Sequence, residues 1–153
     1  KKRIQAKKII EIIKKYPFFR VFETPKIIKH VYYIIPIVYD YKKTRVSREK
    51  LLLALEKEGL EDRLLNGYSN LHLLPIFRNK IAFGKKGIPW TLKESRKNIF
   101  YKNGSCEIAE EYHSKSFIGF LNCAVDATNK DLENIKKIFE KVCSQIEKLR
   151  LLK

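Results

Sequence analysis

The residues best suited to bind a polar ligand lie in one irregular stretch, from Tyr68 to Glu111, which holds the only Trp and two of the five Pro. Tyr68, His72, Trp90 and Tyr101 could offer hydrogen bonds and stacking faces to a ring-shaped polar ligand. The alternative is structural, because Trp90 and Tyr101 could simply fix a long loop to the domain, and spacing alone favours this alternative. Long irregular segments in compact domains are often functional, so the search for a site begins here.

The common catalytic and metal-binding motifs do not occur in this sequence. The run Gly84-Lys85-Lys86-Gly87 lacks the spacing and the following Ser or Thr of a phosphate-binding P-loop, and there is no HExxH. No carboxylate or cysteine stands at metal-ligand spacing from the three histidines, His30, His72 and His113. We therefore expect no metal site and assign no catalytic residue to this chain.

The cysteines are odd in number and form no CxxC pair: Cys106, Cys123 and Cys143. This spacing indicates neither a disulfide framework nor a zinc site, and it is typical of a reducing, cytoplasmic setting. We expect buried, inert thiols. The remaining alternative is that the chain is a small, self-contained enzyme that uses His72 and Cys106.

Helices and strands that could position these residues are predicted on both sides of the irregular stretch. Apolar residues at helical spacing predict a helix over 4–16 that ends at Pro17, and Ser47 and Thr128 are expected to cap two further helices. The β-branched and aromatic run 29–41 predicts a strand covered on both faces, with an edge or a bulge at Pro36. Further elements are a short strand in 60–67, a helix over 106–114 and a strand over 117–122.

This order, α-β-α-(β)-loop-α-β-α, predicts an α/β or α+β sandwich in which a small three-stranded sheet is layered against helices. With 153 residues, of which 44% are hydrophobic, the chain is expected to form a single domain over residues 1–153. The connector 18–28 is expected to be structural. No window approaches the roughly 18 apolar residues of a membrane helix, so no membrane partner is expected.

The net charge of +16 is concentrated at one end of the chain. Residues 1–50 carry 15 basic and 4 acidic side chains, which gives a net charge of +11. Such a surface can attract phosphate, in a nucleic acid or in a nucleotide-linked ligand. However, Lys outnumbers Arg by 25 to 8, whereas nucleic-acid readers depend on Arg. Composition therefore favours a solvated basic face over a nucleic-acid partner.

Taken in order, several segments of the chain resemble the C-terminal part of the pyridoxal-phosphate-dependent sugar aminotransferases of the DegT/StrS type. The segments are 30–37, Ser47-Arg48 with Leu55 and Glu58-Gly59, 67–77, Pro89-Trp90, and Gly104-x-Cys106-x-x-Ala109-Glu110. Arg3 and Ala6 match the family's long connecting helix, here residues 1–16. Two pairs depart from the family pattern and concern the ligand more than the fold, namely Cys106-Glu107 and Ser69-Asn70.

The resemblance implies a fold type I enzyme that works as a homodimer in amino-sugar biosynthesis. In such enzymes a larger N-terminal domain supplies the lysine that binds pyridoxal phosphate and the aspartate that pairs with the pyridinium nitrogen. Neither motif occurs here, so the chain is expected to bind no cofactor and to be inactive in isolation. The absence of Met likewise indicates a piece of a longer protein that lacks its N-terminal partner domain.

The resemblance also implies which residues meet the substrate. In the intact enzyme Tyr68 and His72 would face the active-site cleft and help to select a sugar or nucleotide-sugar, with His30 and Tyr32 nearby. The alternative function is a basic binding module for nucleic acid or an acidic partner, which would lose affinity steeply as salt rises.

Overall fold

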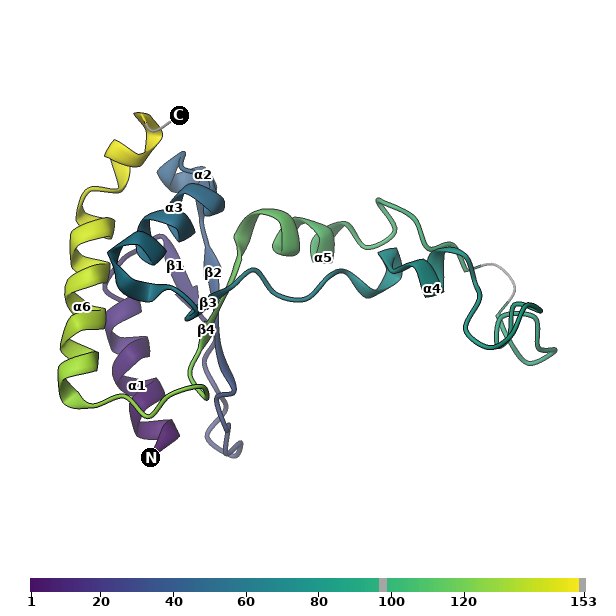
Figure 1. The fold of residues 1–153 in the computed structure, drawn as a ribbon, viewed down its shortest axis with the longest axis horizontal. Helices are drawn as coiled ribbons and strands as arrows, with labels where there is room; N and C mark the ends of the chain where they lie inside the picture. Colours follow the sequence, from purple (N-terminus) through teal and green to yellow (C-terminus); the bar gives the residue numbers. More distant parts are fainter. Residues whose placement is uncertain (97–98, 152–153) are drawn as a thin grey trace. The chain divides into compact units, whose positions relative to one another are not determined.

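The computed structural model describes residues 1–96 and 99–151 (Figure 1). The sequence predicts a single domain over residues 1–153, and the chain divides into two compact units: unit 1, Lys1–Gly67 and Lys115–Lys153, and unit 2, Tyr68–Ser114. No helix in the described part of the chain is long and apolar enough to cross a membrane.

Unit 1 contains a four-stranded antiparallel sheet in the order β1-β2-β4-β3, and the fold is therefore α+β. The strands are β1 (Phe19–Val21), β2 (Ile34–Tyr39), β3 (Leu64–Leu65) and β4 (Phe117–Leu121). The prediction of three strands was wrong by one, because β1 lies in the segment expected to be a connector. Phe19 and Val21 are buried on either side of exposed Arg20, a pattern too short to identify a strand from sequence.

Strand β2 is shorter than predicted and is buried on one face only. Its residues alternate between buried and half-buried, so the expectation of a strand covered on both faces was wrong. The antiparallel pairing explains the alternation, since such sheets need only one covered face. The edge expected at Pro36 is present. Strand β1 pairs with β2 only as far as Ile37, so Pro36 has a partner strand on one side only, which is β4. Residues 29–33 precede the strand as an irregular segment.

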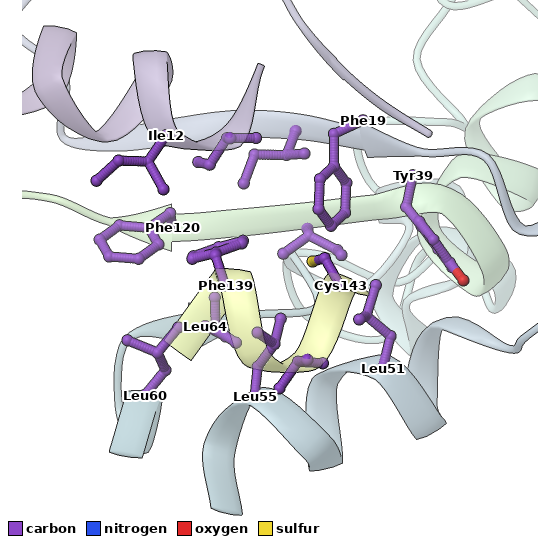
Figure 2. Close-up of a cluster of buried hydrophobic side chains, with 14 of the residues drawn as sticks. Ile12, Phe19, Tyr39, Leu51, Leu55, Leu60, Leu64, Phe120, Phe139 and Cys143 are labelled. Carbon is purple, nitrogen blue, oxygen red and sulfur yellow. The ribbon is translucent and has the colours of Figure 1, made fainter. Parts of the chain in front are cut away.

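Three helices cover the buried face of the sheet (Figure 1): α1 (Lys2–Ile13), α3 (Arg48–Leu55) and α6 (Asn129–Ser144). Unit 1 also contains a short helix, α2 (Tyr41–Thr44), and a 3-10 segment (Ile146–Leu151). Apolar side chains of α1, α3 and α6 meet those of the strands in one core, which includes Phe139 of α6, Phe120 of β4 and Leu55 of α3 (Figure 2).

The helix ends follow the predicted capping residues. The Ser47 side chain accepts a hydrogen bond from the backbone of Lys50, and Thr128 forms a reciprocal capping box with Asp131. After α3 a wider π-type turn, Glu56–Leu60, ends the helix where Gly59 adopts a φ of 115°. A residue with a side chain would be strained there, which explains the glycine.

Unit 2 consists of short helical pieces joined by loops. They are a 3-10 turn (Leu71–Leu73), α4 (Pro75–Arg78) and α5 (Glu107–Glu111), which continues into a π-type turn, Tyr112–Ser116. The helix predicted for 106–114 is therefore confirmed. Three rings pack together within unit 2, those of Phe77, Trp90 and Tyr101, with centroids 5.5 to 6.2 Å apart.

Candidate functional site

His30 and Tyr32 form a closely packed pair in unit 1. Their ring centroids are 4.3 Å apart, and the Tyr32 backbone N–H donates to His30 Nδ1 over 2.8 Å. Because a nitrogen that accepts carries no proton, the hydrogen of the neutral imidazole lies on Nε2. The pair therefore holds His30 with a hydrogen-bond donor on its other ring nitrogen.

Tyr32 occupies a backbone conformation that few residues with a side chain adopt, with a φ of 53°. The fully buried Asn122 stabilises this turn, since its Nδ2 donates to the Tyr32 carbonyl over 3.0 Å. Gln5 Nε2 in turn donates to Asn122 Oδ1 over 3.1 Å. Strained residues held in this way concentrate at functional sites, so the conformation marks the His30–Tyr32 turn as a candidate site.

The same turn lines a groove of about 550 Å³ together with the first turns of α1 and the segment 24–29. The hydroxyls of Thr24 and Tyr32 lie 3.4 Å apart, at hydrogen-bonding distance. His30 and Tyr32 are thus half-buried side chains at the wall of an open groove within unit 1.

His72 is paired with Glu110 in unit 2. Its Nε2 lies 2.8 Å from Glu110 Oε1, and only 12% of its side chain is exposed. Glu110 also accepts from the backbone N–H of Gly104 over 2.9 Å and from that of Cys106 over 3.2 Å. The Gly104 N–H and then the His72 ring hold the pKa of the Glu110 carboxyl below its usual value.

The His72–Glu110 pair fixes the tautomer of the histidine. An ionised carboxylate only accepts hydrogen bonds, so Nε2 donates and Nδ1 of the neutral ring is left as an acceptor. Such a nitrogen can bind a substrate hydroxyl or take up a proton. Within the described residues, no hydrogen bond joins the Cys106 thiol to His72, and Cys106 contributes its backbone N–H to Glu110 instead.

Two other aromatic candidates, Trp90 and Tyr101, contact each other and Phe77 within unit 2. Trp90 Nε1 donates to the Tyr101 hydroxyl over 3.1 Å, and both rings pack with Phe77. This arrangement favours the structural role for Trp90 and Tyr101. Tyr68 is different, since 78% of it is exposed.

The four residues that the sequence predicts to meet the substrate therefore form two groups in different units. The structure brings His30 and Tyr32 together in unit 1, and it places Tyr68 and His72 in unit 2. Sequence reasoning missed Glu110 and Asn122 as their partners. Glu110 belongs to the Ala109-Glu110 pair of the aminotransferase-like motif, which was a usable signal, whereas nothing in the sequence marks Asn122.

The cysteines differ from the expectation of buried thiols. Only Cys143 is buried, and burial raises the pKa of its thiol to about 12. Cys106 and Cys123 are exposed, so the expectation was wrong for these two. Both lie in irregular segments outside the helices and strands, whereas Cys143 lies on the buried face of α6.

The described side chains offer no fitting site for pyridoxal phosphate. Covalent attachment needs a lysine in an enclosed pocket, and no lysine of residues 1–96 and 99–151 is buried. In the same residues no three His, Cys, Asp or Glu side chains cluster as metal ligands would. Compared with known proteins, the chain matches no family model and no curated sequence.

Proposed function

We propose that this chain is the small C-terminal domain of a pyridoxal-phosphate-dependent sugar aminotransferase of the DegT/StrS type, acting in amino-sugar biosynthesis. One observation carries the proposal: the residues behind the resemblance occupy positions with specific structural roles. Ser47 caps α3, Gly59 ends it at positive φ, and Glu110 binds the loop that begins at Gly104. An ordered set of short motifs that also fits the turns and caps of the fold is better supported than any motif alone.

In the proposed role, this chain helps to select the sugar. His72 would use Nδ1 and Tyr68 its hydroxyl to bind the hydroxyls of a keto-sugar or nucleotide-sugar. His30 and Tyr32, in unit 1, are the other two residues that we propose for substrate binding. The cofactor, its lysine and its partner aspartate would belong to a larger N-terminal domain. No catalytic or cofactor-binding residue is assigned to this chain, which would be inactive alone.

The surface of unit 2 is compatible with such a partner. None of its described residues is buried, and several large apolar side chains are exposed, among them Leu71, Phe83, Phe100 and Ile108. Exposed apolar groups of this kind are typical of surfaces that another domain or subunit covers. In the intact homodimeric enzyme the N-terminal domain or the second subunit would cover them. We place this enzyme in the cytoplasm, in keeping with thiols that form no disulfide.

The first test is a titration of the purified chain with pyridoxal phosphate, followed by borohydride reduction and peptide mapping. We expect scattered, substoichiometric labelling of exposed lysines, because none of the lysines in residues 1–96 and 99–151 is buried. Stoichiometric labelling of one lysine would contradict the proposal, since the chain would then hold its own cofactor.

The second test uses the protein extended to the natural start of its coding sequence. We expect the added sequence to contain the cofactor-binding lysine, and the extended protein to transfer an amino group from glutamate to a nucleotide-linked keto-sugar. His72→Gln should raise KM by about tenfold, the usual consequence of losing a hydrogen bond to substrate. Lys57→Gln, an exposed change on unit 1, is the control. An extension without such a lysine domain would overturn the proposal.

The second candidate is a basic binding module, favoured by the net charge of +16. A protein that follows a phosphate backbone loses affinity steeply with salt, by about a factor of 10³ or more between 50 and 200 mM for six or more contacts. Titration of a labelled oligonucleotide at both salt concentrations therefore separates the two functions. Weak binding without that dependence excludes the binding module.

A further inference from the structure

A second groove of unit 1 lies between α3 and the end of α6. Its volume is about 360 Å³, within the range of small-molecule sites, and all of its lining residues belong to unit 1. One wall is α3 with the π-type turn that follows it, and the other is α6 with the 3-10 segment (Figure 1). None of the four residues proposed for substrate binding lines this groove, so a ligand here would be additional to the substrate.

The middle of this groove is apolar. Four aliphatic side chains line it from both walls: Leu53, Ala54, Val142 and Leu149. Leu53 is the most unusual of them, because 55% of it is exposed, whereas the other leucines of α3 are buried, namely Leu51, Leu52 and Leu55. Covering the exposed part of Leu53 with a hydrocarbon group would remove apolar surface from water, which is favourable.

The two ends of the groove differ in how their lysines are compensated. At one end Lys141 forms an ion pair with Glu58, with 2.6 Å between Nζ and Oε2. Glu58 is the single acidic side chain in the described lining. The π-type turn that carries it contacts α6, whereas the 3-10 segment after α6 contacts α3, so the two walls run antiparallel. Lys50, at the start of α3, and Lys148, in the 3-10 segment, therefore lie toward the opposite end.

At that opposite end the partner of Lys148 carries no charge. Lys148 Nζ donates to Gln145 Oε1 over 3.0 Å, and an amide oxygen does not neutralise an ammonium group. A carboxylate placed beside Lys148 could accept a charge-assisted hydrogen bond, which is stronger than the bond to the amide. Lys50 lines the groove as well and adds to the positive potential there.

These features together describe a ligand with a hydrocarbon body and a single anionic head. An inorganic or sugar phosphate would leave the apolar middle of the groove uncovered. An acidic amphipathic helix would need a row of anchoring pockets, and a groove of about 360 Å³ has room for few of them. A short aliphatic chain that ends in a carboxylate matches both the apolar lining and the lysine end.

We propose that this groove binds an alkyl carboxylate of the fatty-acid type. The hydrocarbon chain covers Leu53 and Val142, and the carboxylate pairs with Lys148 near Lys50. This site does not depend on the proposed aminotransferase function, because it shares no residue with the substrate candidates.

The first test is an NMR titration of the full chain with decanoate and, separately, with decylammonium, which has the same chain length and the opposite charge. We expect decanoate to bind about tenfold more tightly than decylammonium, with shifts centred on the amides of Leu53 and Lys148. Octanoate should bind about fourfold more weakly than decanoate, because each methylene would be about half buried in an open groove.

Two variants with matched controls locate the site. Leu53→Gln should weaken decanoate by about tenfold, and Lys148→Gln by about fivefold. The controls are Ile4→Gln, which alters a 64% exposed aliphatic residue on α1, and Lys137→Gln, which removes an exposed charge on α6. We expect each control to weaken binding by less than about twofold. Thermal unfolding checks that every variant is folded.

Four outcomes would overturn the proposal. Equal affinities for decanoate and decylammonium would mean that the lysine end selects no head group. Equal weakening by the groove variants and their controls would mean that decanoate binds diffusely to a basic surface. No binding of decanoate up to its solubility limit would exclude the site. A synthetic acidic amphipathic peptide that shifts the Leu53 amide when decanoate does not would assign the groove to a protein partner instead.

Discussion

The two units of this chain are held together by different interactions. Unit 1 buries 24 hydrophobic residues in one cluster from its helices and strands (Figure 2). Unit 2 buries none of its described residues, and its order comes from the ring group around Trp90 and from the hydrogen bonds of Glu110. Unit 1 is therefore organised by the hydrophobic effect, and unit 2 by a few specific contacts.

This difference predicts two levels of stability in one chain. Full burial of a large apolar side chain stabilises the fold by about 1.5–3 kcal/mol. A hydrogen bond within the protein replaces hydrogen bonds to water, so its net contribution is only about 1 kcal/mol. Segments with few buried contacts open at lower free energy than the core. The residues that sequence analysis connects with ligand selection, Tyr68 and His72, lie in the unit that depends on fewer interactions.

The largest effect should follow from removing a core ring of unit 1. Phe139 is 1% exposed and packs edge-on against Phe19, with 6.1 Å between centroids. We expect Phe139→Ala to lower the free energy of unfolding by about 3–5 kcal/mol, through lost burial and the cavity left behind. Urea unfolding followed by far-UV circular dichroism measures this change.

The matched control is a ring of unit 2. Phe100 is 70% exposed, and Phe100→Ala should change the same free energy by less than about 0.5 kcal/mol. Comparable losses from the two substitutions would contradict the contrast between the units, because they would place Phe100 in a core.

The next effect concerns the polar network beneath the His30–Tyr32 turn. Asn122→Ala removes the amide that binds the Tyr32 carbonyl and leaves Gln5 without its side-chain partner. We expect a loss of about 2 kcal/mol in unfolding free energy, because the carbonyls of Tyr32 and Lys2 lose their amide donor, while Gln5 keeps its bonds to backbone carbonyls. NMR should also show Tyr32 leaving its positive φ.

Asn129→Ala provides the comparison for Asn122→Ala. Asn129 is exposed and accepts a hydrogen bond from the exposed Lys8, so its removal should cost less than about 0.5 kcal/mol. If Asn122→Ala proved equally mild, the Tyr32 conformation would not depend on this network.

Sequence reasoning succeeded where the determining contacts are local. Thr128 and Asp131 stand three residues apart, and their capping box follows from that spacing. Gly59 likewise marked the end of the helix after Ser47. The short strand β1 was missed because its pairing with β2 is a tertiary contact, and three residues carry too little periodicity to reveal it.

The site was predictable only in part, for the same reason. The sequence pointed to His72 but not to Glu110, which is 38 residues away and meets it only through the folding of unit 2. The positive φ of Tyr32 could not be predicted either, because a tyrosine has no preference for that conformation and Asn122 imposes it from 90 residues away.

A smaller, local effect should follow from changing Glu110. Glu110→Gln keeps the shape but removes the charge that binds the N–H groups of Gly104 and Cys106. We expect hydrogen exchange at these two amides to accelerate by about tenfold while the amides of α6 keep their protection. Simultaneous loss of protection in α6 would mean that the units unfold together.

The same carboxylate predicts a response to acid. Because its pKa is lower in the folded chain than its ordinary value, it stabilises unit 2 at pH values above that ordinary value. The stabilisation is lost as the pH falls through the lowered folded pKa. Protection at Gly104 should therefore weaken on acidification in the unaltered chain and change less in Glu110→Gln, which has no carboxyl there to titrate.

The smallest effect should come from the hydrogen bond between Trp90 and Tyr101. Trp90→Phe and Tyr101→Phe each remove one partner of the 3.1 Å bond while keeping an aromatic ring. We expect each to speed proteolytic cleavage within unit 2 by about threefold, since the lost bond contributes about 0.6 kcal/mol to closing the unit.

The double variant decides whether that effect belongs to the hydrogen bond. If it does, Trp90→Phe with Tyr101→Phe should be cleaved no faster than either single variant, because the bond can be lost only once. Multiplying effects would show instead that each ring stabilises unit 2 through its own packing against Phe77. Either substitution should leave the urea midpoint of unit 1 unchanged, since no residue of its core is altered.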